Sequence, residues 1–126
     1  MERYKNKVTK QVVTHIMETY GQQPEFLWAG DNDTAAIRHP KTKKWFAVLM
    51  MRLPKEKLGI SGGGKVDVLN LKRNPAAYLV DNEHIFPAYH MNKEHWISVV
   101  LDDATNQAEL FFLIDESYRL VGPKRK

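Results

Sequence analysis

The chain of 126 residues contains no cysteine, which excludes disulfides, thiol catalysis and cysteine-ligated zinc. No run approaches the roughly 18–20 apolar residues that a membrane-spanning helix needs. Residues 1–5 lack the apolar region of a signal peptide. We therefore expect a cytoplasmic protein that does not bind a membrane.

The charged residues show a small excess of one sign. Nineteen Lys and Arg residues against fifteen Asp and Glu residues give a net charge of +4, which slightly favours polyanionic partners such as nucleic acids. Hydrophobic residues make up 43% and charged residues 27%, proportions that are ordinary for a globular protein. The length predicts one domain, residues 1–126, with a single core.

Hydrophobic periodicity divides the chain into short elements. Residues 6–20 predict a helix, with Asn6 as its N-cap and Gly21 as its C-terminal stop. A second long helix is expected over 106–121, and a short one over 74–81. Apolar runs rich in strand-forming residues predict strands over 25–28, 34–39, 44–51, 65–71 and 97–101.

The strand over 44–51 is the most apolar. Simple alternation places one set of side chains on one face and a second set on the other: Trp45, Ala47, Leu49 and Met51 against Phe46, Val48 and Met50. Both sets are apolar, which indicates a central strand that is covered on both sides for part of its length.

The order of these elements predicts the α+β class, with two layers and a single antiparallel sheet that carries its helices mainly on one face. The strands over 34–39 and 44–51 would form one β-hairpin. Residues 55–64 would form the mobile tip of a second hairpin.

Both predicted hairpin tips carry lysines, namely Lys41, Lys43 and Lys44 on the first and Lys55, Lys57 and Lys65 on the second. Two basic β-ribbons could contact phosphates on either side of a DNA groove. Lysine at strand edges also protects sheets against aggregation, so this alternative stays open. The glycines over 59–64 do not predict a nucleotide-binding loop, because Val66 lacks the required hydroxyl and a strand follows instead of a helix.

The segment 87–102 combines polar and aromatic residues with a strand, and its polar part holds Tyr89, His90, Asn92, Lys93, His95 and Trp96. Asn92 favours a turn, in which we expect His90 and Asn92 to form local hydrogen bonds that orient Lys93. The histidine spacing matches no zinc pattern, and no nucleophile motif is present. We therefore predict no metal, no cofactor and no catalytic residue.

Two further features concern exposed aromatic rings. Five rings lie on or beside predicted strands: Trp28, Trp45, Phe46, Tyr89 and Trp96. Such rings can stack on bases, but a small domain needs large side chains in its core, so we expect most to be buried, with Tyr89 as the exception. Phe112 falls on the polar face of the last helix, which indicates self-association or a protein partner.

The motif Pro-Ala-Tyr-His-x-Asn-Lys-x-His-Trp at 87–96 resembles that of the MmcQ/YjbR family, also called YyaQ-like. These are small bacterial proteins usually described as DNA-binding. The similarity extends through Tyr20-Gly21, Pro24-Glu25, Trp28, Lys44-Trp45-Phe46-Ala47, Val66-Asp67, Asn74-Pro75, Asp115 and Ser117-Tyr118. The resemblance implies the same two-layer fold with the two hairpins as wings.

Together these features predict a non-catalytic protein that contacts the phosphates of double-stranded DNA through two basic hairpins. One alternative is a protein-interaction module that uses the sheet face or the C-terminal helix. Another is a small-ligand protein or enzyme that uses a pocket containing His90 and Lys93.

Overall fold

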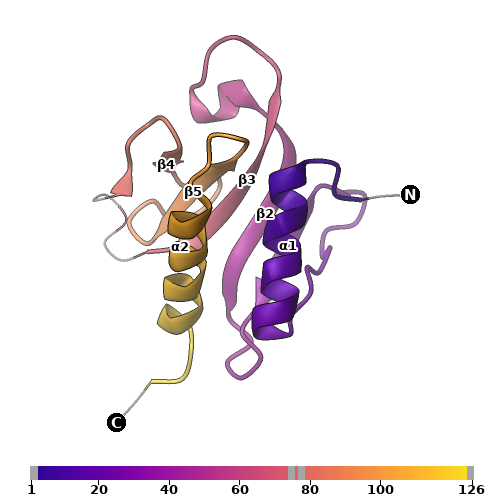
Figure 1. Cartoon of the computed structure of the whole chain (residues 1–126), viewed down its shortest axis with the longest axis vertical. Helices are drawn as coiled ribbons and strands as arrows, with labels where there is room; N and C mark the ends of the chain where they lie inside the picture. Colours follow the sequence, from indigo (N-terminus) through magenta and orange to yellow (C-terminus); the bar gives the residue numbers. More distant parts are fainter. Residues whose placement is uncertain (1–2, 74–75, 77–78, 125–126) are drawn as a thin grey trace.

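The computed structural model describes residues 3–73, 76 and 79–124. Over these ranges, five strands form one antiparallel sheet, and two α-helices cover one of its faces (Figure 1). In chain order the elements are α1 (Lys7–Tyr20), β1 (Thr34–Arg38), β2 (Trp45–Pro54), the 3₁₀-helix η1 (Lys55–Leu58), β3 (Lys65–Lys72), β4 (Ile85–Pro87), β5 (Trp96–Leu101) and α2 (Gln107–Leu120). The predicted α+β class with a single antiparallel sheet is confirmed.

Helix α1 begins and ends where its sequence predicts. The Asn6 side chain accepts a hydrogen bond from the Val8 N–H at 2.8 Å. Gly21 adopts the left-handed conformation with φ of 68°, and its N–H donates to the Met17 carbonyl. Both ends of the helix are therefore capped by local interactions.

Helix α2 has a similar start but a different end. The Asn106 side chain accepts from the Glu109 N–H at 3.0 Å, whereas the helix closes at Val121 in a right-handed conformation. The next residue is Gly122, and a larger residue would be crowded there, because a Cβ atom would lie only 3.2 Å from Nε2 of His39. The helix end is thus packed against the turn between β1 and β2.

The strand order is β1-β2-β3-β5-β4, so β1 and β4 are the edges. The sequence did not predict β4, a three-residue strand whose Pro87 is tolerated at an edge. The prediction of a strand over 25–28 is wrong, because this segment makes only an isolated bridge between Glu25 and Ala36. Half of the helix expected over 74–81 falls on residues outside the described ranges, namely 74, 75, 77 and 78.

Strand β2 contains a bulge near its start. Ile37 pairs with Ala47, but Arg38 pairs with Trp45, which leaves Phe46 as an extra residue. A bulge of this kind interrupts the alternation of side chains between the two faces. The faces predicted for the first residues of this strand are therefore wrong.

The bulge sends two neighbouring rings to opposite faces. Phe46 is fully buried and packs edge-on against Tyr20 of α1 and Tyr118 of α2, with ring centroids 5.6 and 5.1 Å away. The sheet face that points away from α1 and α2 is here called the second face. Trp45 lines a cavity on this face together with Val48 and Met50 of β2.

Both faces of the inner strands are buried, mainly by apolar side chains. The core between helices and sheet includes Val12, Ile16, Leu49, Leu69, Ile97, Leu110 and Ile114. The second face buries Val48, Met50, Val68, Asn70, Ser98 and Val100. The prediction that β2 is central and covered on both sides is confirmed.

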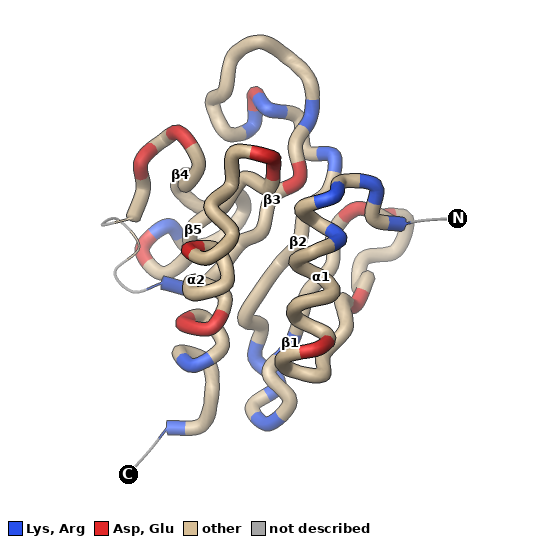
Figure 2. Tube along the Cα trace, viewed as in Figure 1, with Lys and Arg blue, Asp and Glu red and all other residues tan. Residues whose placement is uncertain are grey.

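The two hairpin tips lie at opposite ends of β2. The β1–β2 tip comes directly before this strand, and the β2–β3 connection, which opens with η1, comes directly after it. Ten residues at about 3.3 Å each separate the tips by about 30 Å. Figure 2 shows basic residues at both ends of the molecule.

Candidate nucleic-acid interface

A buried histidine orders the β1–β2 tip. Only 4% of the His39 surface is exposed, and its Nδ1 accepts a hydrogen bond from the Lys41 N–H at 3.0 Å. The centroid of its ring lies 4.3 Å from the ring centroid of Tyr118. The Thr42 hydroxyl donates to the Val121 carbonyl at 2.7 Å. The tip is thus held against the end of α2.

His39 performs this role as a neutral ring. Burial lowers the pKa of His39, and the nearby charge of Lys41 lowers it further. A neutral imidazole protonated at Nε2 leaves Nδ1 free to accept a hydrogen bond. The backbone that carries the tip lysines is therefore ordered by a side chain that stays uncharged near neutral pH.

Beside this tip lies a shallow hollow of about 360 Å³, here called the lysine hollow, lined by Lys43, Lys44, Trp45, Lys72, Trp96 and Val121. Lys43 and Lys44 come from the tip, while Lys72 ends β3 and pairs with Trp96, the first residue of β5. The hollow therefore combines two of the predicted phosphate-binding lysines with one residue of the 87–96 motif. Lys72, which is not among the six predicted lysines, completes it.

Lys41 lies on the same tip but does not line the hollow. The remaining three predicted lysines, Lys55, Lys57 and Lys65, lie at the far end of β2. Near this end, the Asp67 carboxylate accepts hydrogen bonds from the Arg52 N–H at 3.0 Å and from the Thr9 hydroxyl at 2.6 Å. Figure 2 shows acidic positions among the basic ones here. The six lysines thus form two separate groups, and the far group is interleaved with negative charge.

The 87–96 motif is held against the second face by a buried polar network. Asn70 of β3 and Ser98 of β5 lie opposite each other and are fully buried. The Ser98 hydroxyl donates to Asn70 Oδ1 at 2.5 Å and accepts from the Tyr89 N–H at 2.9 Å. The Asn70 amide in turn donates to the Tyr89 carbonyl at 2.9 Å. Both polar groups of Tyr89's backbone are therefore satisfied.

Sequence reasoning did not single out Asn70 or Ser98. Their signal was present, because each is an isolated polar residue inside an apolar strand. Buried polar side chains of this kind need partners. Here the partners come from the motif segment.

The polar turn within the motif agrees in part with expectation. Asn92 Oδ1 accepts from the Glu94 N–H at 2.7 Å, which confirms the local hydrogen bond expected of it. His90 has a positive φ of 62°, and its ring lies 3.9 Å from that of Tyr89. Lys93 is exposed, and it does not line the cavity that His90 lines.

That cavity has a volume of about 330 Å³ and is here called the tryptophan pocket, lined by Trp28, Asp31, Thr34, Trp45, Val48, Met50, His90 and Met91. Trp28 and Trp45 meet edge to face, with ring centroids 5.7 Å apart. Trp28 is 40% exposed, and among the five aromatic residues expected near strands only Phe46 is fully buried. The expectation that most of these rings belong to the core is therefore wrong.

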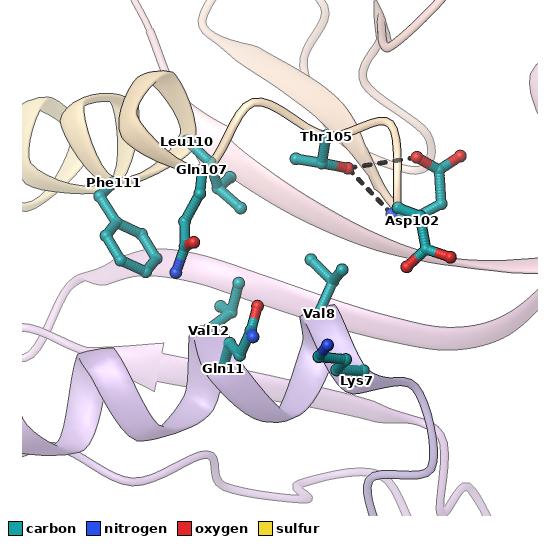
Figure 3. Close-up of a pocket in the computed structure, with 10 residues that line it drawn as sticks. Lys7, Val8, Gln11, Val12, Asp102, Thr105, Gln107, Leu110 and Phe111 are labelled. Atoms are coloured by element: carbon teal, nitrogen blue, oxygen red, sulfur yellow. Dashed lines mark hydrogen bonds between the residues drawn. The ribbon is translucent and has the colours of Figure 1, made fainter.

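A third cavity, of about 190 Å³, lies between the starts of the two helices (Figure 3). Val8 and Val12 of α1 face Leu110 of α2 across it, with polar side chains of both helices around them. Thr105 closes one end through a hydrogen bond from the Asp102 N–H at 2.9 Å. The lining carries both signs of charge and no arrangement of nucleophile and base.

Within the described ranges, no three His, Asp or Glu side chains gather closely enough to hold a metal ion. None of the helices found there is both long and apolar enough to cross a membrane.

Comparison with known proteins identifies the family. The sequence profile of the YjbR family matches residues 17–120. The chain belongs to the YjbR family. The uncharacterized protein YyaQ of Bacillus subtilis is 42% identical over 111 residues, which cover 86% of this chain and 93% of YyaQ. The uncharacterized protein YjbR of Escherichia coli K12 is 35% identical over 54 residues, or 40% of this chain and 46% of that protein.

Solved structures show the same YjbR-like fold. A crystal structure of a Pseudomonas syringae protein superposes with a TM-score of 0.85 at 39% identity, covering 90% of this chain and 97% of that one. Protein DR2400 of Deinococcus radiodurans has a TM-score of 0.68 at 21% identity, covering 95% and 82%, and shares the fold alone. The predicted family is therefore confirmed. The names of these related proteins state no function.

Proposed function

We propose that the protein binds double-stranded DNA without a catalytic step and contacts the backbone phosphates through the lysine hollow. The observation that carries this proposal is that three lysines and two tryptophans line one hollow. Lysines position a protein on DNA through phosphate contacts, and aromatic rings beside them add contact surface for sugars and bases.

The charges of the hollow are also uncompensated. In the described part of the chain, no ion pair involves Lys43, Lys44 or Lys72, whereas the arginines 38, 52, 73 and 119 each pair with a carboxylate. A lysine without an ion-pair partner can contact a DNA phosphate. That contact releases counterions that were condensed on the DNA, which favours binding. The hollow therefore favours a polyanion over a neutral partner.

The far lysines, 55, 57 and 65, would act as a second contact. Their distance of about 30 Å along β2 is close to one helical turn of DNA, about 34–36 Å. They would reach phosphates roughly one turn away from those at the hollow, rather than the two sides of a single groove.

A salt series tests the proposal. Changing Lys43, Lys44 and Lys72 together to Gln removes three charges and keeps side-chain length. We expect weaker binding to a short duplex in fluorescence anisotropy, and a salt slope that falls by about one unit for each contacting lysine. The fold should survive, because Lys43 and Lys44 are exposed and Lys72 is half-buried, and such surface charges contribute little stability.

The matched control changes Lys5, Lys7 and Lys10 at the start of α1 to Gln, which removes the same net charge far from the hollow. Its slope should fall by less than that of the hollow variant. A folded hollow variant with an unchanged slope would remove the hollow from the mechanism. Absence of duplex binding by the wild type at low salt would overturn DNA binding and give first place to the interaction-module alternative.

A further inference from the structure

We infer that the tryptophan pocket takes one unpaired nucleobase, whose own phosphate lies on the lysine hollow. This inference rests on the proposed function for the phosphate contact and adds a site for the base. It assigns a ligand class to the cavity on the second face, and it makes DNA with an unpaired base a better ligand than a fully paired duplex.

The two sites share a wall. Trp45 lines both the tryptophan pocket and the lysine hollow, and it directly follows Lys43 and Lys44 in the sequence. A ligand that contacts the Trp45 ring from the pocket therefore lies next to the lysines. A nucleotide joins a flat apolar ring system to an anion, which matches this pairing of surfaces.

The pocket lining suits a flat ring. Two indoles, Trp28 and Trp45, stand beside the thioethers of Met50 and Met91. Bases stack on aromatic side chains irrespective of sequence, because every base has a π-face, and thioether sulfur makes favourable contacts with aromatic rings. A volume of about 330 Å³ is at the small end of ligand pockets, which fits one base rather than a stack of bases.

The charges fix which way the nucleotide lies. Asp31 lines the pocket next to Trp28, because its N–H donates to the Trp28 carbonyl at 3.1 Å. Its carboxylate accepts from the N–H groups of Asp33 and Thr34 at 2.8 and 3.0 Å. These hydrogen bonds lower the pKa of Asp31, so the carboxylate is ionised at neutral pH. A phosphate is repelled from that side and attracted to the lysines beyond Trp45.

The pocket is also largely formed before any ligand arrives. Its floor, Val48 and Met50, is buried on the inner strand β2. The wall that contains His90 follows Tyr89, whose backbone is held by the Asn70–Ser98 network. Trp28, by contrast, is partly exposed, so its ring has room to turn from an edge contact to a stacking position.

The same chemistry occurs in a free nucleotide and in an unpaired base within a DNA strand. The experiment therefore uses four probes in fluorescence anisotropy or competition: a fully paired duplex, the same duplex with one bulged base, the corresponding single strand, and deoxyadenosine monophosphate. We expect the bulged duplex and the single strand to bind more tightly than the paired duplex, by about tenfold as is typical for one base stacked on an aromatic ring.

The deciding variant is Trp28→Leu, compared with Leu27→Ala as the matched control. Leu27 is the neighbouring residue and is similarly exposed, but it does not line the pocket. Trp28→Leu should remove the preference for unpaired bases and leave the salt slope unchanged, while Leu27→Ala should keep both. If circular dichroism shows that Trp28→Leu is misfolded, Met91→Glu replaces it, because a second negative charge in the pocket should also abolish the preference.

The outcomes separate this inference from the proposed function. Equal binding of paired and bulged duplexes, unchanged by either pocket variant, would overturn the base site and leave phosphate binding intact. Loss of the preference in Trp28→Leu, together with an unchanged salt slope in the lysine-hollow variant, would instead overturn the phosphate contact and support the pocket. Tight binding of the mononucleotide identifies a free nucleotide as the source, and binding of strands alone identifies DNA.

Discussion

His39 accepts the Lys41 N–H only while its ring is neutral, and this links the order of the β1–β2 tip to pH. Folding lowers the pKa of His39 below its ordinary value of about 6.5. Between the two values the unfolded chain binds more protons than the folded chain, so stability rises with pH. The contribution of His39 is therefore complete above about pH 6.5 and is lost as pH falls through the folded pKa.

The corresponding test replaces His39 with Gln, which keeps a hydrogen-bond acceptor and cannot titrate. We expect the free energy of unfolding of this variant, measured by urea denaturation at several pH values, to fall less below pH 6.5 than that of the wild type. His15→Gln is the comparison. Burial also lowers the pKa of His15, but His15 is more exposed than His39, so its replacement should change the pH dependence less. A His39→Gln variant with the pH dependence of the wild type would contradict the assignment.

Ser98 is the second residue whose single side chain determines a wider arrangement. Ser98→Ala leaves Asn70 Oδ1 and the Tyr89 N–H without their partner in a buried site. Unsatisfied buried groups of this kind cost about 1–3 kcal/mol, which urea denaturation should detect. Ser61→Ala, in the exposed β2–β3 connection, should stay within about 0.5 kcal/mol of the wild type. A Ser98→Ala variant as stable as this control would show that the network is not needed.

At the scale of elements, the bulge in β2 decides the chemistry of both sheet faces. It directs Phe46 into the core beneath the helices and turns Trp45 to the second face. Without it, Trp45 would point at α1 and α2, and the lysine hollow and the tryptophan pocket would lose their shared wall. One extra residue in one strand thus brings the candidate site together.

Helix α2 carries a separate element-scale prediction. Phe112 is 58% exposed, as its place on the polar face predicted, and such a ring favours self-association or a protein partner. If it mediates self-association, Phe112→Ser should reduce the sedimentation coefficient at micromolar concentration, while Leu120→Ser, an exposed apolar control on the same helix, should not. A wild type that already sediments as a monomer would rule out self-association at that concentration.

At the scale of the whole molecule, the distance between the two lysine groups predicts a dependence on DNA length. A duplex of about 8 base pairs is shorter than the helical turn of 10–10.5 base pairs that would let both ends bind. We expect affinity to rise for duplexes of about 16 base pairs, because the far lysines then add phosphate contacts. Changing Lys55, Lys57 and Lys65 to Gln should remove this gain and leave binding of the short duplex unchanged. Equal loss on both duplexes would show that the far group acts at the same place as the hollow.

The sequence by itself determined what depends on near neighbours in the chain. Asn6, Gly21 and Asn106 mark helix ends because caps are local hydrogen bonds. Asn92 marks its turn for the same reason. The apolar runs indicated most of the strands and the α+β class. Lys43, Lys44 and Trp96 were also recognised as candidate site residues from residue type and position.

Tertiary structure decided everything that depends on pairing between distant segments. A bulge arises when two strands align, so the alternation of Trp45 and Phe46 could not reveal it. The β4 edge needs β5 as its partner, and the buried role of Asn70 needs both Ser98 and the Tyr89 backbone. The split of the basic tips follows from their attachment to opposite ends of one strand. These features are set by contacts between residues far apart in sequence, where local propensity carries no information.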